Sequence, residues 1–151
     1  MILETLLAAL HLLAILTMVV FVSSTAALCQ PQWLNAPALE RLARVQLIYV
    51  GAMLAVLLSG LARSIWGIKG SEWYWSAPLL HLKLSLLVLL VLLAIKPTLT
   101  VRNWRKTLRL SGTLPNAEQV LRTRRSIMGQ AHLMALLAVL GVAFARGWWH
   151  A

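Results

Sequence analysis

A few isolated ionisable side chains could do chemistry, because they fall within or beside long apolar stretches. They are His11, His81, His132, Lys83 and Arg63. Such a side chain is costly in a membrane, so each is a functional candidate. The acids are only Glu4, Glu40, Glu72 and Glu118, so a carboxylate-bridged metal pair is not expected. The single cysteine, Cys29, excludes an intrachain disulfide and is expected to be a small apolar residue at a helix end.

The chemistry that fits isolated histidines on different helices is axial ligation of haem iron. A b-type haem needs one or two imidazoles, an apolar slot and cations beside its propionates. We predict that His11 and His81 approach each other in the outer half of the bundle and are the metal ligands of a haem b. Lys83 and Arg63 are expected at the polar edge of the slot, and His132 is a further cofactor-binding candidate. A hydrogen-bonding role between helices is the alternative for each histidine.

Four stretches are long and apolar enough to cross a membrane as helices, which takes about 20 residues each. They cover about residues 2–28, 45–62, 78–95 and 127–145. The chain is 60% hydrophobic and only 12% charged, whereas a soluble domain carries about a quarter charged residues. The sequence therefore predicts an all-α, four-helix membrane bundle, formed as one domain by residues 1–151, with a basic connection at about 96–126.

The long basic connection has its own pattern. Pro97 is expected to end the third span, and Asn116 with Gln119 resembles a capping box that starts the fourth helix. Between them, one helical face is apolar and the opposite face is basic. The apolar face holds Val101, Trp104 and Leu108, and the basic face holds Arg102, Arg105, Lys106 and Arg109. This pattern predicts an interfacial amphipathic helix that binds anionic lipid, and no nucleic-acid partner is expected.

Two stripes on the first and second spans predict packing. Glu4, His11 and Met18 recur every seven residues, so they share one face of the first helix. The second span carries small residues at intervals of four before Arg63. These are Gly51, Ala55 and Ser59. Small residues at that spacing let helices approach closely, either within the chain or in a homodimer.

The distribution of Lys and Arg predicts the orientation. Ten of the 14 lie in the first and third connections, which places these connections in the cytoplasm. Both termini are then on the outer, periplasmic side of a bacterial inner membrane. Aromatic residues on that side are expected to form an interfacial belt. These are Trp73, Tyr74, Trp75, Trp148 and Trp149.

Nearly the whole chain resembles an uncharacterised bacterial family of four-span membrane proteins, known only as a domain of unknown function. The segments GIKG, HLK and KPT, in that order, are the most specific part of the match. More distantly, the early histidine of the first span and the HLK of the third resemble HemJ-type protoporphyrinogen oxidases. That resemblance implies porphyrin binding, with His11 as a haem-binding or catalytic candidate and Lys83 as a carboxylate partner.

Three functions follow as alternatives. The first is a membrane protein that binds haem b or a porphyrin and, if it is an enzyme, is a membrane oxidoreductase. The second is a small transporter whose histidines serve a proton or substrate path. The third is a structural or assembly subunit without a cofactor, in which histidines bridge helices. The sequence contains no Gly-rich nucleotide loop and no metal-binding cysteine pair.

Overall fold

The structure is a computed structural model that describes residues 2–66 and 71–146, with the backbone alone at 71, 73, 74, 144 and 145. It consists of four long helices and one short helix, and the described residues form no strand. The helices are α1 (Ile2–Leu28), α2 (Ala36–Trp66), α3 (Ser71–Ser76), α4 (Pro78–Ser111) and α5 (Ala117–Ala145). The all-α architecture predicted from the sequence is confirmed.

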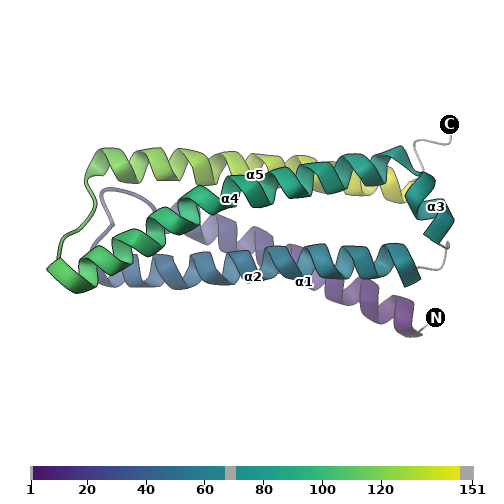
Figure 1. Ribbon diagram of the computed structural model, residues 1–151, viewed down its shortest axis with the longest axis horizontal. Coiled ribbons are helices and arrows are strands. Elements are labelled where there is room, and N and C mark those ends of the chain that lie inside the picture. The colour runs from purple at the N-terminus through teal and green to yellow at the C-terminus, as the bar shows by residue number, and fades with distance from the viewer. Residues whose placement is uncertain (1, 67–70, 147–151) are drawn as a thin grey trace.

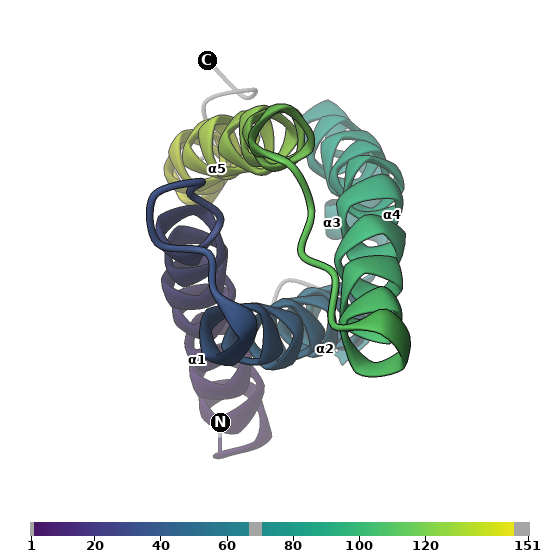
Figure 2. The same ribbon diagram turned by 90° about the vertical axis from the view of Figure 1, so that its left-hand side faces the viewer.

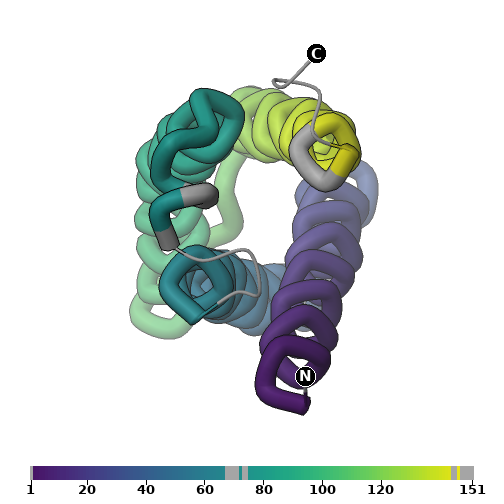
Figure 3. Tube along the Cα trace, turned by 90° about the vertical axis from the view of Figure 1, so that its right-hand side faces the viewer, coloured from purple at the N-terminus to yellow at the C-terminus, as the bar shows by residue number. Residues whose placement is uncertain are grey.

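The four long helices form a closed ring. Around this ring, α1 packs against α2 and α5, and α4 packs against the same two helices (Figures 2 and 3). The start of α1, the end of α5 and the short α3 lie at the same end of the bundle, which is called the terminal end (Figure 1). The opposite end carries the α1–α2 and α4–α5 connections and is called the basic end (Figure 1). The α1–α2 and α4–α5 connections are short, covering residues 29–35 and 112–116.

The outer surface of the ring is apolar, as a lipid-facing surface must be. All four long helices are long and apolar enough to cross a membrane. Large apolar side chains face outward along α1, among them Leu6 and Leu13, which are 56% and 59% exposed. The interior contains Met18, Val22 and Leu90, with partners from each long helix. In water such a surface would be unfavourable, whereas lipid solvates it at no cost.

α4 does not end at Pro97, as the sequence analysis expected. It continues for 34 residues, about 50 Å at 1.5 Å per residue, with Pro97 buried inside it. Proline removes the N–H that would bond to the carbonyl four residues earlier, which belongs to Leu93. Gln130 of α5 donates its Nε2 hydrogen to that carbonyl oxygen at 3.4 Å. A side chain from a neighbouring helix thus satisfies the carbonyl, so the helix continues.

The segment after Pro97 is not a separate helix but the continuation of α4, and its apolar face packs on the bundle, which corrects a second expectation. Val101 is buried, and Trp104 and Leu108 pack against the core cluster. Two arginines of the basic face bind Glu40 of α2: Arg105 Nε donates to Oε2 at 2.8 Å, and Arg109 Nε donates to Oε1 at 2.8 Å. The last turns of α4 therefore belong to the bundle, and its basic connection is largely helical.

The capping box at the start of α5 is confirmed. The backbone N–H of Gln119 donates to Asn116 Oδ1 at 2.9 Å, and the backbone N–H of Asn116 donates to Gln119 Oε1 at 3.2 Å. Cys29 lies just after α1, fully buried, and its thiol points to the carbonyl of Val120 at 3.7 Å. Burial raises the pKa of Cys29 to about 11, so it stays a thiol at neutral pH and has the apolar role expected of it.

Of the small residues spaced by four on α2, only Ser59 lies where α2 packs closely against another helix of the chain. Gly51 and Ala55 are exposed, and a Cβ built at Gly51 meets no atom within 4 Å. The close approach is at Gly60, one residue beyond Ser59, where a Cβ would lie 3.2 Å from Cε1 of His11. Within the chain, therefore, α1 and α2 approach each other beside His11.

Candidate functional site

His11 of α1 is hydrogen-bonded to Ser59 of α2. The His11 Nδ1 to Ser59 Oγ distance is 2.8 Å. The single hydroxyl proton of Ser59 is donated to the backbone carbonyl of Ala55, at 2.6 Å. When that proton goes to Ala55, Ser59 Oγ accepts from His11 and the proton of the neutral ring is on Nδ1. The lone pair is then on Nε2, the form in which an imidazole binds a metal.

An ion pair lies on the same face of α1, about two turns closer to the terminal end. The Arg63 guanidinium of α2 is 3.7 Å from the Glu4 carboxylate. Both side chains are largely shielded, at 34% and 20% exposed. The Nε of Arg63 is buried and has no hydrogen-bond partner among the described residues. Because Met18 is also buried, the predicted stripe of Glu4, His11 and Met18 is confirmed as the face of α1 that packs inward.

Lys83 of α4 extends into the ring toward α5. Its Nζ is 3.9 Å from the point where a Cβ on Gly141 would lie, so the absence of a side chain there leaves room for the ammonium group. The positive charges of Arg63 and Lys83 both act on the His11 ring. Three helices therefore converge on one polar cluster at the terminal end. It consists of Glu4, His11, Ser59, Arg63 and Lys83, with one negative and two positive charges.

His81 does not join this cluster. It is exposed, and its Nε2 donates to the backbone carbonyl of Trp75 at 2.9 Å. Its ring is tilted at 53° to that of Trp75, with centroids 6.1 Å apart. Because successive residues are 100° apart on a helix, His81 points away from the side on which Lys83 points inward. The structure therefore brings His11 together with Arg63 and Lys83, and does not bring His81 to His11.

His132 is exposed on α5, and its Nδ1 donates to the carbonyl of Met128 one turn earlier, at 2.7 Å. It has no contact with the polar cluster in the part of the chain that the structure describes. Of the predicted aromatic belt, Trp75 is 44% exposed beside α4. Trp148 and Trp149 lie outside the described residues, as do the side chains of Trp73 and Tyr74.

A second polar network was missed by the sequence analysis, and it lies between α2, α4 and α5. The Tyr49 hydroxyl donates to Gln130 Oε1 at 3.0 Å, and Gln46 Nε2 donates to Thr98 Oγ1 at 2.8 Å. Gln46 and Gln130 are 2% and 0% exposed. The available signals were glutamines in apolar stretches and the carbonyl that Pro97 leaves without a donor. This network joins helices and carries no charge.

The fold and the polar cluster together define the class, a small four-span membrane protein. The model of a family described as "Predicted membrane protein (DUF2214)" matches residues 3–148. Because the match covers nearly the whole chain, the protein belongs to that family. No curated protein and no solved structure matches the chain. The family supports a location in a membrane and leaves the ligand of the polar cluster open.

Proposed function

We propose that the protein binds a haem or a related porphyrin in the terminal half of the bundle, where His11 would hold the iron of a haem. The observation that carries this proposal is the 2.8 Å hydrogen bond between His11 Nδ1 and Ser59 Oγ, because it engages Nδ1 and leaves Nε2 as the nitrogen that would bind a metal. Metal-bound histidines commonly have the other ring nitrogen held in this way. The ring is also placed inside the bundle, beside Gly60, rather than on the lipid face.

The positive side chains of Arg63 and Lys83 suit the propionate edge of a porphyrin. A porphyrin has an apolar ring and two propionate carboxylates, which need positive partners. Arg63 and Lys83 lie near His11, and the buried Nε of Arg63 is a donor without a partner among the described residues. Arginine and lysine pair with carboxylates through charge-assisted hydrogen bonds. The resemblance to HemJ-type oxidases supports the same class of ligand.

The arrangement changes the expected ligand set. With His81 bonded through Nε2 to Trp75, this proposal uses one histidine ligand instead of the pair expected from the sequence. A haem bound in this way supplies redox chemistry at its iron. The contribution of the chain is to hold the ring by His11, to pair the propionates with Arg63 and Lys83, and to keep water from the apolar edge.

The test is reconstitution of the purified protein with haemin and, separately, with iron-free protoporphyrin IX. We expect His11→Ala to abolish the histidine-ligated haem spectrum, while His132→Ala and His81→Ala retain it. Arg63→Gln should weaken binding of both pigments by about tenfold, because a charge-assisted hydrogen bond contributes about 1.5 kcal/mol. His11→Ala should still bind protoporphyrin IX, since that pigment has no iron to ligate.

Two results would contradict the proposal. One is an unchanged haem spectrum in His11→Ala. The other is a protein that binds neither pigment, which would favour the transporter and assembly-subunit alternatives. Circular dichroism of each variant separates a lost ligand from a lost fold, since an all-α bundle has a strong helical signal.

A further inference from the structure

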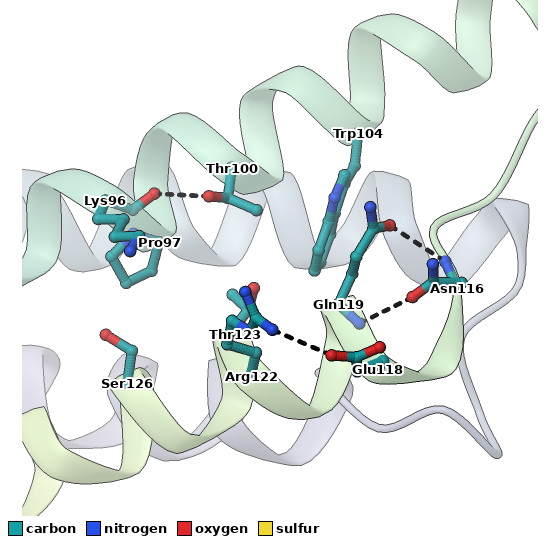
Figure 4. Close-up of a pocket in the computed structure, with 10 residues that line it drawn as sticks. All are labelled: Lys96, Pro97, Thr100, Trp104, Asn116, Glu118, Gln119, Arg122, Thr123 and Ser126. Carbon is teal, nitrogen blue, oxygen red and sulfur yellow. Dashed lines mark hydrogen bonds and ion pairs between the residues drawn. The ribbon is translucent and has the colours of Figure 1, made fainter.

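A groove lies at the basic end, far from the polar cluster, where α4 and α5 separate. Its volume is about 440 Å³, and it is open on one side (Figure 4). Side chains of both helices line it, including Lys96, Thr100 and Trp104 of α4 and Arg122, Thr123 and Ser126 of α5. Figure 4 shows α4 along one wall and the first turns of α5 along the other.

The groove exists because α4 leaves α5 along its second half. Figure 1 shows α4 beside α5 near the terminal end and beside the start of α2 at the basic end. Pro97 lies within α4 on the wall of the groove, and prolines bend helices at such positions. Glu40 then holds the last turns of α4 on α2 through Arg105 and Arg109. The separation of α4 from α5 is thus built into the fold.

Some polar side chains of the groove already pair with each other, whereas others have no partner of this kind among the described residues. Asn116 and Gln119 cap α5 with each other, and Arg122 pairs with Glu118 at 3.0 Å. Lys96 makes no ion pair in the part of the chain that the structure describes. A cationic donor is therefore available at the membrane side of the groove.

Two hydroxyl groups on the opposite wall, those of Thr123 and Ser126, accompany this cation. Neither hydroxyl has a side-chain hydrogen bond within residues 2–66 and 71–146. An ammonium group and hydroxyl donors around a small space are typical of a site for a phosphate group. The pairing of Arg122 with Glu118 leaves the lysine as the charge that a phosphate would meet first.

The surroundings of the groove suit an amphiphile more than a free ion. Lys96 directly follows the apolar run of the third span, which places the groove at the level of lipid headgroups. One and two turns further into the membrane, Leu93 and Leu89 of α4 are exposed, at 42% and 43%. Trp104 lines the groove beyond the lysine, and tryptophan favours the interfacial region of a membrane.

We propose that this groove binds the headgroup of an acidic glycerophospholipid, with its phosphate between Lys96 and Ser126 and an acyl chain along Leu93 and Leu89. The proposal places a defined lipid site between α4 and α5, instead of diffuse attraction to the whole basic end. It does not depend on the proposed haem site at the other end of the bundle.

The test is native mass spectrometry of the full-length protein, released from neutral detergent after addition of phosphatidylglycerol, phosphatidylcholine or inorganic phosphate. We expect a one-to-one complex with phosphatidylglycerol that Lys96→Gln weakens by about fivefold, as loss of one charge-assisted contact implies. Ser126→Ala should weaken it less. The matched control is Lys106→Gln, which removes the same charge from an exposed position of α4 outside the groove and should change binding by less than about twofold.

Three outcomes would overturn the proposal. If Lys106→Gln weakens binding as much as Lys96→Gln, the attraction is diffuse. If phosphatidylcholine binds as well as phosphatidylglycerol, the groove does not select acidic lipid. If inorganic phosphate displaces the lipid at equal concentration, the ligand is free phosphate. Helical circular dichroism of Lys96→Gln confirms that a loss of binding is not a loss of fold.

Discussion

At the scale of single residues, the side of the helix on which a polar residue lies decides which groups it can contact. His81 and Lys83 are two positions apart, so they point to nearly opposite sides of α4. His81 is exposed and bonded to Trp75, whereas Lys83 points toward Gly141 inside the ring. On α4 the lysine therefore points into the ring and the histidine does not, so the histidine pair is not formed.

The hydrogen bonds of Gln130 give the first prediction at this scale. Gln130→Leu leaves the buried Tyr49 hydroxyl without its acceptor and removes the donor to the Leu93 carbonyl. We expect a loss of about 1–3 kcal/mol in the free energy of unfolding, the usual cost of an unpaired buried polar group. Unfolding in detergent, followed by circular dichroism, measures it. The double variant with Tyr49→Phe should recover part of the loss; wild-type stability of Gln130→Leu would show that the network does not stabilise the bundle.

Two glycines of α2 give a matched pair of variants. Gly51→Ala adds a methyl group in open space, so the better helix propensity of alanine should raise stability by about 0.5–1 kcal/mol. Gly60→Ala places the same group 3.2 Å from the His11 ring, which Ser59 holds in position. We expect Gly60→Ala to be about 1 kcal/mol or more less stable than Gly51→Ala in the same unfolding assay. Equal stability of the two variants would show that the His11 ring moves aside freely.

At the scale of elements, the helices are longer than the membrane requires. α4 has 34 residues, and α2 begins at Ala36, well before the span expected from about residue 45. The additional turns form the basic end, where Glu40 joins α2 to α4. Arg124 of α5 donates to the carbonyl of Ala26 near the end of α1, at 3.3 Å. A cation beside a helix C-terminus interacts favourably with its dipole.

The start of α5 provides a prediction for an element boundary. Asn116→Ala removes the side-chain oxygen that accepts from the N–H of Gln119. We expect a loss of about 1 kcal/mol in the free energy of unfolding, together with faster amide hydrogen exchange in the first turn of α5. The control is Asn103→Ala, an exposed asparagine within α4, which should be neutral or slightly stabilising because alanine favours a helix. Unchanged exchange at residues 117–120 would contradict a capping role.

At the scale of the whole molecule, the ring of helices presents an apolar outer surface and two polar ends of different character. The terminal end contains the polar cluster around His11, and the basic end contains the groove around Lys96. The two sites are separated by the apolar core that contains Leu90 and Val22. The two proposed sites therefore lie toward opposite ends of the bundle.

Orientation in the membrane is a prediction for the whole molecule. The excess of Lys and Arg at the basic end predicts that this end faces the cytoplasm. In a Cys29→Ala background, Glu72→Cys should react with an impermeant maleimide in intact cells. Thr113→Cys should react only after the membrane is permeabilised. Both positions are exposed and lie at opposite ends. The reverse labelling pattern would invert the topology.

The sequence by itself determined the number of long helices, the start of α1 and α5, and the inward face of α1. These features depend on local patterns: apolar length, a capping box and the spacing of Glu4, His11 and Met18. The tertiary structure decided which polar groups meet. The bond from His11 to Ser59 and the bond from Gln130 to Leu93 join residues 48 and 37 positions apart. Whether such residues meet depends on how neighbouring helices are rotated and offset relative to each other. Packing between whole helix faces sets that rotation and offset, and a local sequence pattern does not determine it.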